Sequence, residues 1–340
     1  MRRLLGILAA LVAVVIVAAC STADENASTT ETTTGADANT TATQSDNVQL
    51  TQRRGLTIAM VTHGDGGSFW SVAKKGAQDG AKDMGVRLRY TESNNDPEKQ
   101  AQMIEAAVTE KVDGLAVSAP NPDAIKGAVQ RARSAGIPVV TLNSGAEQSS
   151  ELGAFTHVGQ TETIAGQGAG RQFKQAGVKK VLCVIHEQAN IGLNQRCDGA
   201  KTGFGGSVTT LQVKGTDDIQ TTLTEIQSKL SSDRSFDGVL ALNPDIAVAA
   251  RDAAKAARSD AKVATFDLSG DVVKSIADGS ILFAVDQQQY LQGYLPVVFL
   301  TLNKTNANTV GGGRPVLTGP GFVTKENAAT IERLAEAGTR

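Results

Sequence analysis

The chain has 340 residues, and 33 Lys and Arg against 35 Asp and Glu leave a formal net charge of −2. This balance argues against nucleic acid as a partner, because binding to a phosphate backbone needs a basic surplus or a basic stripe. Three cysteines, three histidines and no Cys-x-x-Cys spacing argue against a structural zinc site, and we expect no metal and no cofactor. The length favours two domains rather than one.

The N-terminus predicts export. Arg2 and Arg3 precede an apolar stretch over residues 4–19, which ends in Val-Ala-Ala directly before Cys20. A short positive region, an apolar stretch and small residues before a cleavage point are typical of a secretory signal. The stretch is shorter than the about 20 residues that a membrane-spanning helix needs. Val-Ala-Ala-Cys resembles a bacterial lipobox, which implies removal of residues 1–19 and a lipid on Cys20 that anchors the protein to the membrane surface.

The segment after Cys20 has the composition of a tether. Residues 21–47 contain twelve Ser or Thr and five acidic residues, without a Lys or Arg. Such a segment cannot bury enough apolar surface to offset the entropy of ordering it. We therefore expect residues 20–54, with the lipid-bearing Cys20 at their start, to form a disordered tether.

From residue 56 onward, short apolar runs alternate with amphipathic segments at helical spacing. The first cycle predicts a strand at 56–61, a glycine-rich turn at 63–67 and a helix at 68–85, for which Ser68 is a good N-cap. Strands that alternate with helices form parallel sheets covered on both faces, and about ten strands are too many for one twisted sheet. We predict an α/β fold with two Rossmann-like lobes. The other predicted strands are 86–91, 114–118, 138–142, 157–159, 181–185, 208–213, 238–242, 263–266 and 281–285, with helices at 96–111 and 122–135.

Polar residues stand at the carboxyl ends of the predicted strands, the edge where open parallel sheets bind ligands. They are amides, hydroxyls, histidines and single acids, without a paired acid and base. Because each sugar hydroxyl both donates and accepts a hydrogen bond, this composition suits a neutral polyhydroxyl ligand. For the two histidines in the set, ligand contact and an ordinary loop role both stay open, whereas His157 is typical of a core histidine. The set is His63, Asn94, Ser118, Asn143, His186, Asn243, Asp267 and Gln287.

The enzyme motifs fail. The run 186–190, His-Glu-Gln-Ala-Asn, begins like a zinc-protease helix, but Asn190 stands where the second histidine must be. The glycine-rich run 166–170 falls inside a predicted helix rather than in the strand-to-helix turn where phosphates bind, so we expect it to allow close helix packing. Without a Walker A motif or a G-x-S-x-G elbow, the sequence indicates a protein that is not an enzyme.

Cys183 lies in a predicted strand and Cys197 in the helix that follows it. An exported protein meets an oxidising compartment, and a bridge that closes a loop of about 15 residues stabilises a fold by about 3 kcal/mol in the entropic model. A disulfide and two buried free thiols both stay open, because spacing alone does not give the geometry.

Short motifs in separate segments share one pattern. They are Phe69 and Trp70 after the first turn, Asn143 after Val-Thr-Leu, Arg196 of an Arg-x-x-Gly, Asn243 at a strand end, Phe266 and Asp267 as a Phe-Asp pair, and Gln287 six residues before a glycine. Each motif alone is weak; the aromatic pair, for example, would otherwise be interpreted as ordinary core at a helix start. Together they resemble one family, the type I periplasmic binding proteins, in its ribose- and galactose-binding branch. The resemblance covers about residues 55–330, and it implies that the matching residues contact a ligand.

Two positions depart from the family pattern. Ser144 stands where the family often has an arginine directly after the Asn143 position, and Gly67 replaces a polar residue that often opens the aromatic turn. Both differences leave fewer hydrogen-bond donors, so ribose is not assumed as the ligand.

The resemblance implies two hinge-linked lobes that close over one neutral sugar or polyol. Lobe one is expected at 55–158 plus 289–312, and lobe two at 159–288 plus 313–340. The resemblance implies delivery of the ligand to an ABC permease. Together with the lipobox, we expect a monomer that is lipid-anchored on the extracytoplasmic face of the bacterial membrane. A signal receptor of the same fold, which presents a small molecule to a membrane sensor, is the alternative.

Overall fold

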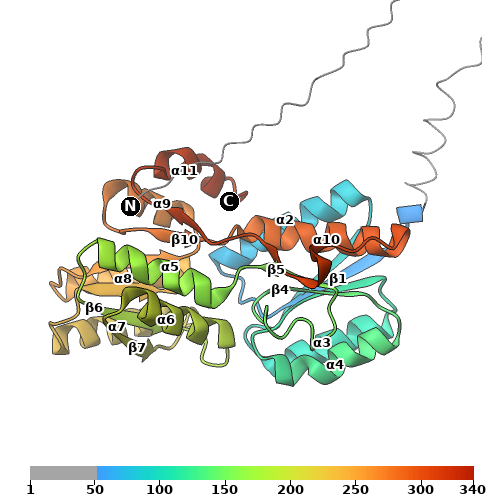
Figure 1. Cartoon of the computed structure of the whole chain (residues 1–340), viewed down its shortest axis with the longest axis horizontal. Helices are drawn as coiled ribbons and strands as arrows, with labels where there is room; N and C mark the ends of the chain where they lie inside the picture. Colours follow the sequence, from blue (N-terminus) through green and yellow to red (C-terminus); the bar gives the residue numbers. More distant parts are fainter. Residues whose placement is uncertain (1–51) are drawn as a thin grey trace, which may run out of the picture. The chain divides into compact units, whose positions relative to one another are not determined.

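The computed structural model describes residues 52–340, which form two six-stranded sheets. Figure 1 shows helices on both faces of each sheet, as expected when continuous apolar runs form strands that are buried on both sides. The signal predicted at 1–19, the lipid site at Cys20 and the tether up to residue 51 lie outside the described residues. Within the described part, no helix combines the length and the apolar character needed to cross a bilayer.

Lobe one contains the first sheet, whose strand order is β11-β5-β4-β3-β1-β2 with every pair parallel. Helices α2 and α10 pack on one face and α3 and α4 on the other. The elements of this lobe are β1 (Thr57–Thr62), α2 (Ser68–Met84), β2 (Arg87–Glu92), α3 (Pro97–Thr109), β3 (Gly114–Ser118), α4 (Pro122–Ser134), β4 (Val139–Asn143), β5 (Thr156–Gly159), α10 (Gln289–Asn306), the 3-10 turn Gly311–Gly313 and β11 (Val316–Leu317).

Lobe two contains the second sheet, in the order β12-β10-β9-β8-β6-β7, and only its edge strand β12 runs antiparallel to its neighbour. Helices α5 and α6 pack on one face, and α7, α8, α9 and α11 on the other. The elements are α5 (Glu162–Gln175), β6 (Lys180–Ile185), α6 (Ile191–Phe204), β7 (Ser207–Gln212), α7 (Ile219–Ser232), β8 (Gly238–Ala241), α8 (Pro244–Ala256), β9 (Lys262–Phe266), α9 (Gly270–Asp278), β10 (Ala284–Asp286), β12 (Gly321–Val323) and α11 (Ala328–Glu336).

The last crossing between the lobes comes later in the chain than the sequence predicts. Strand β11 pairs with β5 in lobe one, and β12 pairs with β10 in lobe two. The crossing therefore lies between Leu317 and Gly321, and residues 313–317 belong with lobe one rather than with lobe two. Strands of two and three residues are too short to show a hydrophobic period, which is why the sequence pattern does not reveal them.

The three crossings between the lobes are hydrogen-bonded to one another. The backbone nitrogen of Thr318 donates to the carbonyl oxygen of Gly159 at 2.7 Å, and its hydroxyl donates to the carbonyl oxygen of Gln287 at 2.7 Å. The side-chain amide of Gln288 donates to the carbonyl oxygen of Thr318 at 2.5 Å. The crossings thus form one connected hinge.

Glycines bring one helix pair in each lobe into backbone contact. A Cβ on Gly166 of α5 would collide with the carbonyl oxygen of Arg196 in α6, and a Cβ on Gly293 of α10 would collide with that of Ala73 in α2. The run 166–170 lies within α5, as expected, and serves close helix packing rather than phosphate binding.

Candidate ligand-binding site

Residues at the carboxyl ends of strands from both sheets line one small cavity of about 30 Å³. This is the edge of an open parallel sheet at which ligands bind, so the fold places these residues where the sequence predicts a site. The lining comprises His63, Phe69, Trp70 and Asn143 from lobe one, His186, Glu187, Asn190, Leu193, Arg196, Leu242, Asn243 and Asp267 from lobe two, and Gln287 from a crossing.

Of the ligand residues that the resemblance implies, all except Phe266 line this cavity. Two of the strand-end candidates, Asn94 and Ser118, do not line it, and the hydroxyl of Ser118 is hydrogen-bonded to Nδ1 of His63 at 2.7 Å instead. Phe266 is fully buried, and the guanidinium carbon of Arg196 lies 4.5 Å from the centre of its ring. The expectation of direct ligand contact is therefore corrected for Phe266: its ring supports Arg196, because a guanidinium stacks favourably on an aromatic face. Ligand contact by the other residues stays a prediction.

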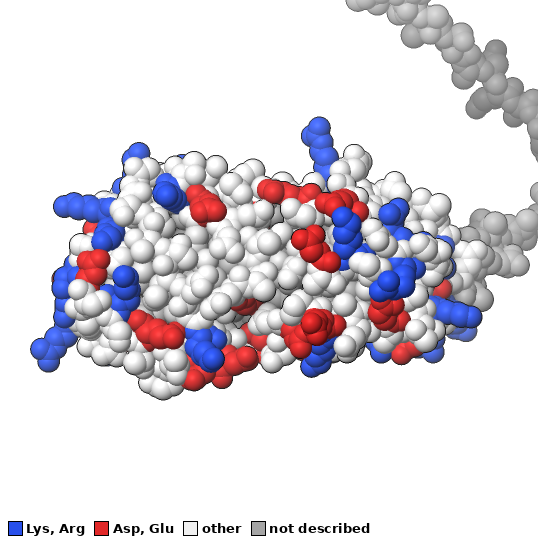
Figure 2. Space-filling model, turned by 90° about the horizontal axis from the view of Figure 1, so that it is seen from below, with Lys and Arg blue, Asp and Glu red and all other residues white. Residues whose placement is uncertain are grey.

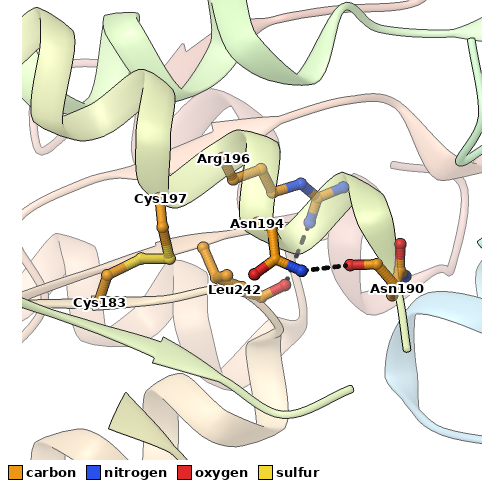
Figure 3. Close-up of a disulfide and its surroundings, with 6 residues drawn as sticks. All are labelled: Cys183, Asn190, Asn194, Arg196, Cys197 and Leu242. Atoms are coloured by element: carbon orange, nitrogen blue, oxygen red, sulfur yellow. Dashed lines mark hydrogen bonds between the residues drawn. A yellow bond between two sulfur atoms is a disulfide. The ribbon is translucent and has the colours of Figure 1, made fainter. Parts of the chain in front are cut away.

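A buried ion pair holds Arg196 in lobe two. Its Nε donates to Oε2 of Glu162 at 2.6 Å, and its Nη2 donates to Oε1 of the same carboxylate at 3.0 Å. Its Nη1 donates to the carbonyl oxygen of Leu242 at 3.2 Å, the bond drawn from α6 in Figure 3. Two parallel bonds to one carboxylate fix the orientation of the guanidinium as well as its distance. Glu162 is the first residue of α5, a helix that the sequence analysis did not connect with the site.

Asp267 directly follows β9 and lines the cavity. Its backbone is left-handed, with φ of 70°, a region that Asp and Asn tolerate better than most residues. Burial raises the pKa of its carboxyl to about 7, although Arg196 and the side-chain amide of Gln287 both act to lower it. The amide of Gln287 donates to Oδ1 at 2.7 Å, and Nη1 of Arg196 lies 3.9 Å from Oδ2.

A chain of amides connects the cavity wall of lobe one with that of lobe two. The Nδ2 of Asn143 donates to Oε1 of Gln292 at 3.3 Å, and the Nε2 of Gln292 donates to Oε1 of Gln287 at 2.8 Å. Gln287 in turn donates to Asp267. Since every link is buried, the chain couples Asn143 and Asp267 through the hinge.

The aromatic pair at the start of α2 is both core and cavity wall. Phe69 and Trp70 are each 4% exposed and meet edge to face, with ring centres 4.9 Å apart. Trp70 packs in the core cluster with Ile58 and Val297, and it also lines the cavity. The interpretation as ordinary core and the interpretation as cavity wall are therefore compatible.

Sequence reasoning missed part of the lining. The run 186–190 fails as a zinc motif, yet three of its side chains line the cavity. A signal existed for Glu187, because it directly follows a strand-end residue. Asn190 was concealed by a second role, since its Oδ1 accepts from the backbone nitrogen of Gly192 as the N-cap of α6. The missed residues are Glu187, Asn190, Leu193 and Leu242; His63 and His186, which the sequence left open, also line the cavity.

Glu187 gathers polar groups from both lobes. Its Oε2 accepts from Nδ2 of Asn190 at 2.6 Å and lies 3.6 Å from Nε2 of His63, while its Oε1 lies 3.7 Å from Nε2 of His186. Burial lowers the pKa of His63, and it lowers the pKa of His186 to about 4. At neutral pH both imidazoles are therefore uncharged and can donate or accept hydrogen bonds.

Direct hydrogen bonds join the lobes outside the cavity. The hydroxyl of Ser68 donates to Oδ1 of Asp245 at 2.7 Å, and the hydroxyl of Thr216 donates to Oδ2 of Asp65 at 2.5 Å. These bonds hold the lobes together, so the structure is a closed form. A larger hollow of about 750 Å³ borders these residues, but it shares no residue with the strand-end cavity. Within residues 52–340, no group of three or more His, Cys, Asp or Glu could hold a metal ion.

Comparison with known proteins agrees with this architecture. The family model of the periplasmic binding protein domain matches residues 58–302. A carbohydrate transporter from Acidothermus cellulolyticus, solved in complex with myo-inositol, is 44% identical, with a TM-score of 0.81 over 84% of this chain and 99% of that chain. The ribose import binding protein of Bacillus subtilis is 29% identical over 230 residues, covering 67% of this chain and 74% of the relative. That of Haemophilus influenzae is 27% identical over 246 residues, covering 71% and 83%. The chain belongs to the periplasmic binding protein family, and it is a binding protein rather than an enzyme.

Proposed function

We propose that this protein captures a neutral, ring-shaped polyol outside the cytoplasm, a monosaccharide or a cyclitol such as an inositol, and delivers it to an ABC importer. The observation that carries the proposal is the cavity itself, whose lining combines amides, two carboxyl groups and an indole ring. Amides and carboxylates match the donors and acceptors of hydroxyl groups, and a flat ring covers the C–H face of a sugar. The relative that holds myo-inositol and the ribose import relatives support this ligand class.

The charges around the cavity favour a neutral ligand. Arg196 is the only Lys or Arg among the lining residues of the described chain, and its guanidinium is already paired with Glu162. Glu187 and Asp267 line the same cavity. A carboxylate or phosphate on the ligand would meet these acids in a poorly solvated space, which is unfavourable. We therefore expect glucuronate and inositol phosphates to be excluded.

Closure of the lobes is the binding step in this proposal. A cavity of about 30 Å³ has room for about one water molecule, so a six-membered polyol ring enters only when the lobes part. A ligand that touches both lobes then shifts the population toward the closed form by its higher affinity for that form. A wrong epimer leaves buried polar groups unpaired, at a cost of about 1–3 kcal/mol each.

The N-terminal sequence and the surface support the proposed cellular setting. The Val-Ala-Ala-Cys20 motif supports a lipid anchor. On the face of the molecule in Figure 2, acidic and basic side chains are mixed, which suits a small neutral ligand better than a polyanion.

Cys20→Ala should release the protein from membranes or block its processing. A variant that is processed normally and still sediments with membranes would exclude the anchor.

Calorimetric titration tests the ligand class. The mature protein is titrated with myo-inositol, ribose, glucose and galactose, with glucuronate and inositol phosphate as charged controls. We expect saturable binding of at least one neutral compound and none of the charged ones. Deletion of the gene, followed by uptake of the bound compound, tests delivery to an importer. No binding across the neutral panel would overturn the proposal.

A further inference from the structure

We propose that the disulfide between Cys183 and Cys197 positions the ligand-facing side chains of lobe two, and is not only a stabilising cross-link. The inference rests on the proposed function, since it concerns the same cavity. The structure contains this disulfide, which resolves the alternative of two free thiols that the sequence left open. The bridge joins β6 to α6 on one face of the second sheet.

The two bridged elements supply much of the polar wall of lobe two. Strand β6 leads directly into His186 and Glu187, and α6 begins after its N-cap Asn190 and carries Arg196 next to Cys197. Figure 3 shows the disulfide below α6 and the side chain of Arg196 extending from the same helix turn. A covalent link at this point fixes how α6 lies along β6, and it thereby fixes the relation between the histidine side and the arginine side of the cavity.

Helix α6 needs such a constraint, because its sequence is a poor helix former. Its 14 residues include Gly199 in the interior, where a glycine costs about 1 kcal/mol relative to alanine, and Gly192 and Gly203 in the first and last turns. Gly199 and Gly203 cannot become larger, since a Cβ on either would collide with the carbonyl oxygen of Thr163 or Gln167 in α5. The helix therefore depends on tertiary contacts for its position.

The non-covalent contacts between β6 and α6 are apolar, whereas Gly166, Gly199 and Gly203 bring α6 into backbone contact with α5. Cys183 and Cys197 are buried among apolar side chains, including Phe173 and Phe204. Apolar contacts depend on the area that is buried and not on direction, so they resist a slide of the helix along the strand less strictly than a covalent link does. Arg196 tolerates little sliding, because its bonds to the Glu162 carboxylate require a fixed geometry.

Removal of the bridge separates positioning from plain stabilisation. In Cys183→Ala/Cys197→Ala we expect the Kd for myo-inositol to rise about tenfold, a typical coupling between contacting residues. The matched control is Leu230→Ala, a buried residue of α7 on the opposite face of the same sheet. It should lower the unfolding midpoint without changing the Kd. If the cysteine variant also loses only stability, and its Kd equals that of wild type, the proposal is overturned.

A double-mutant cycle identifies the residue through which the bridge acts. In an Arg196→Lys background, removal of the bridge should change the Kd by less than about twofold, because the bidentate geometry that the bridge protects is already lost. A full additional tenfold loss would mean that the bridge does not act through Arg196, and it would overturn that step.

Hydrogen exchange keeps this test independent of the ligand. In the ligand-free protein, backbone amides of 191–204 should exchange faster without the bridge, while those of α8 should not change. If the wild-type protein binds no myo-inositol, the proposed function fails, and the exchange measurement still decides whether the bridge fixes α6. Unchanged exchange in α6 would overturn the positioning role even if the ligand binds.

Discussion

Lobe one and lobe two have related folds, but they hold their ligand-facing side chains by different means. In lobe one, Phe69 and Trp70 lie at the start of α2, which packs against α10, and their positions depend on apolar contacts. In lobe two, Arg196 lies in the middle of α6 and is fixed by a bidentate ion pair and a neighbouring disulfide. Apolar contacts supply area without direction, whereas paired charges fix an orientation. We infer that lobe one covers the ligand and lobe two selects it.

The largest expected effect concerns the ion pair of lobe two. Arg196→Ala leaves the carboxylate of Glu162 buried without its partner, so we expect a loss of about 3–5 kcal/mol in the free energy of unfolding. Urea denaturation measures it. Arg171→Ala, an exposed residue of α5, is the control and should change stability by less than about 0.5 kcal/mol. If the two substitutions lower the free energy of unfolding equally, the ion pair between Arg196 and Glu162 does not stabilise lobe two.

Backbone contact between helices should be equally strict in the two lobes. Gly293→Ala in lobe one and Gly199→Ala in lobe two each place a Cβ against a carbonyl oxygen, and each should cost about 1–3 kcal/mol of stability. Gly127→Ala is the matched control, because this glycine lies in α4 with only the side chain of Arg131 nearby. It should be neutral or stabilise by up to about 1 kcal/mol. A tolerated alanine at Gly293 alone would mean that lobe one is packed more loosely.

Asp267 in lobe two and the histidines of both lobes should give the stability opposite dependences on pH. The pKa of Asp267 is raised from 3.8 to about 7, so between these values the folded chain holds a proton that the unfolded chain lacks. This contribution to stability is therefore complete below about pH 4 and is lost as the pH rises through 7. The lowered pKa of His63 and of His186 acts in the opposite direction.

Comparison of variants isolates the contribution of Asp267. Through Asp267, the free energy of unfolding of wild type should decline by up to about 1.4 kcal/mol per pH unit between pH 4 and 7. Asp267→Asn should lack this decline. Asn143→Ala, at the corresponding strand end of lobe one, should leave the slope unchanged. Thermal unfolding across this pH range measures both. If Asp267→Asn parallels wild type, the carboxyl group is ionised throughout and the assignment is wrong.

The smallest effect should come from the covering wall of lobe one. Trp70 is the only tryptophan of the chain, so its emission reports on this wall alone. Addition of a ligand should change the emission saturably, because closure removes water from the indole. Trp70→Phe keeps an aromatic face and should weaken binding by no more than about fivefold. A ligand confirmed by calorimetry that leaves the emission unaltered, with normal binding by Trp70→Ala, would remove Trp70 from the site.

The fold was largely predictable, because the strands are continuous apolar runs and the ligand edge follows from their direction. The same reasoning located Asn143, Asn243 and Asp267, each at the end of a strand. It did not find interactions between residues that lie far apart along the chain. Arg196 and Glu162 lie 34 residues apart on different helices, and no local pattern records that they pair.

Residues with two roles were also missed. Asn190 caps a helix and lines the cavity at once, so its local role explains it completely until the lobes are brought together. Phe266 shows the converse error. The Phe-Asp match implies ligand contact, but the ring of Phe266 is fully buried and lies against the guanidinium of Arg196. Strand β11 adds a third limit, since two residues carry no period.

The connected hinge has a consequence for how such a protein can evolve. Because Thr318 is bonded to Gly159 and Gln287 in the other two crossings, a change at Thr318 would alter the balance between open and closed forms without touching the ligand. Such a change multiplies the Kd of every ligand by the same factor, and it leaves the ratio between two epimers as it was. Substitutions at the hinge can then adjust the affinity to the scarcity of the nutrient. The cavity, which is unchanged, keeps its discrimination between ligands.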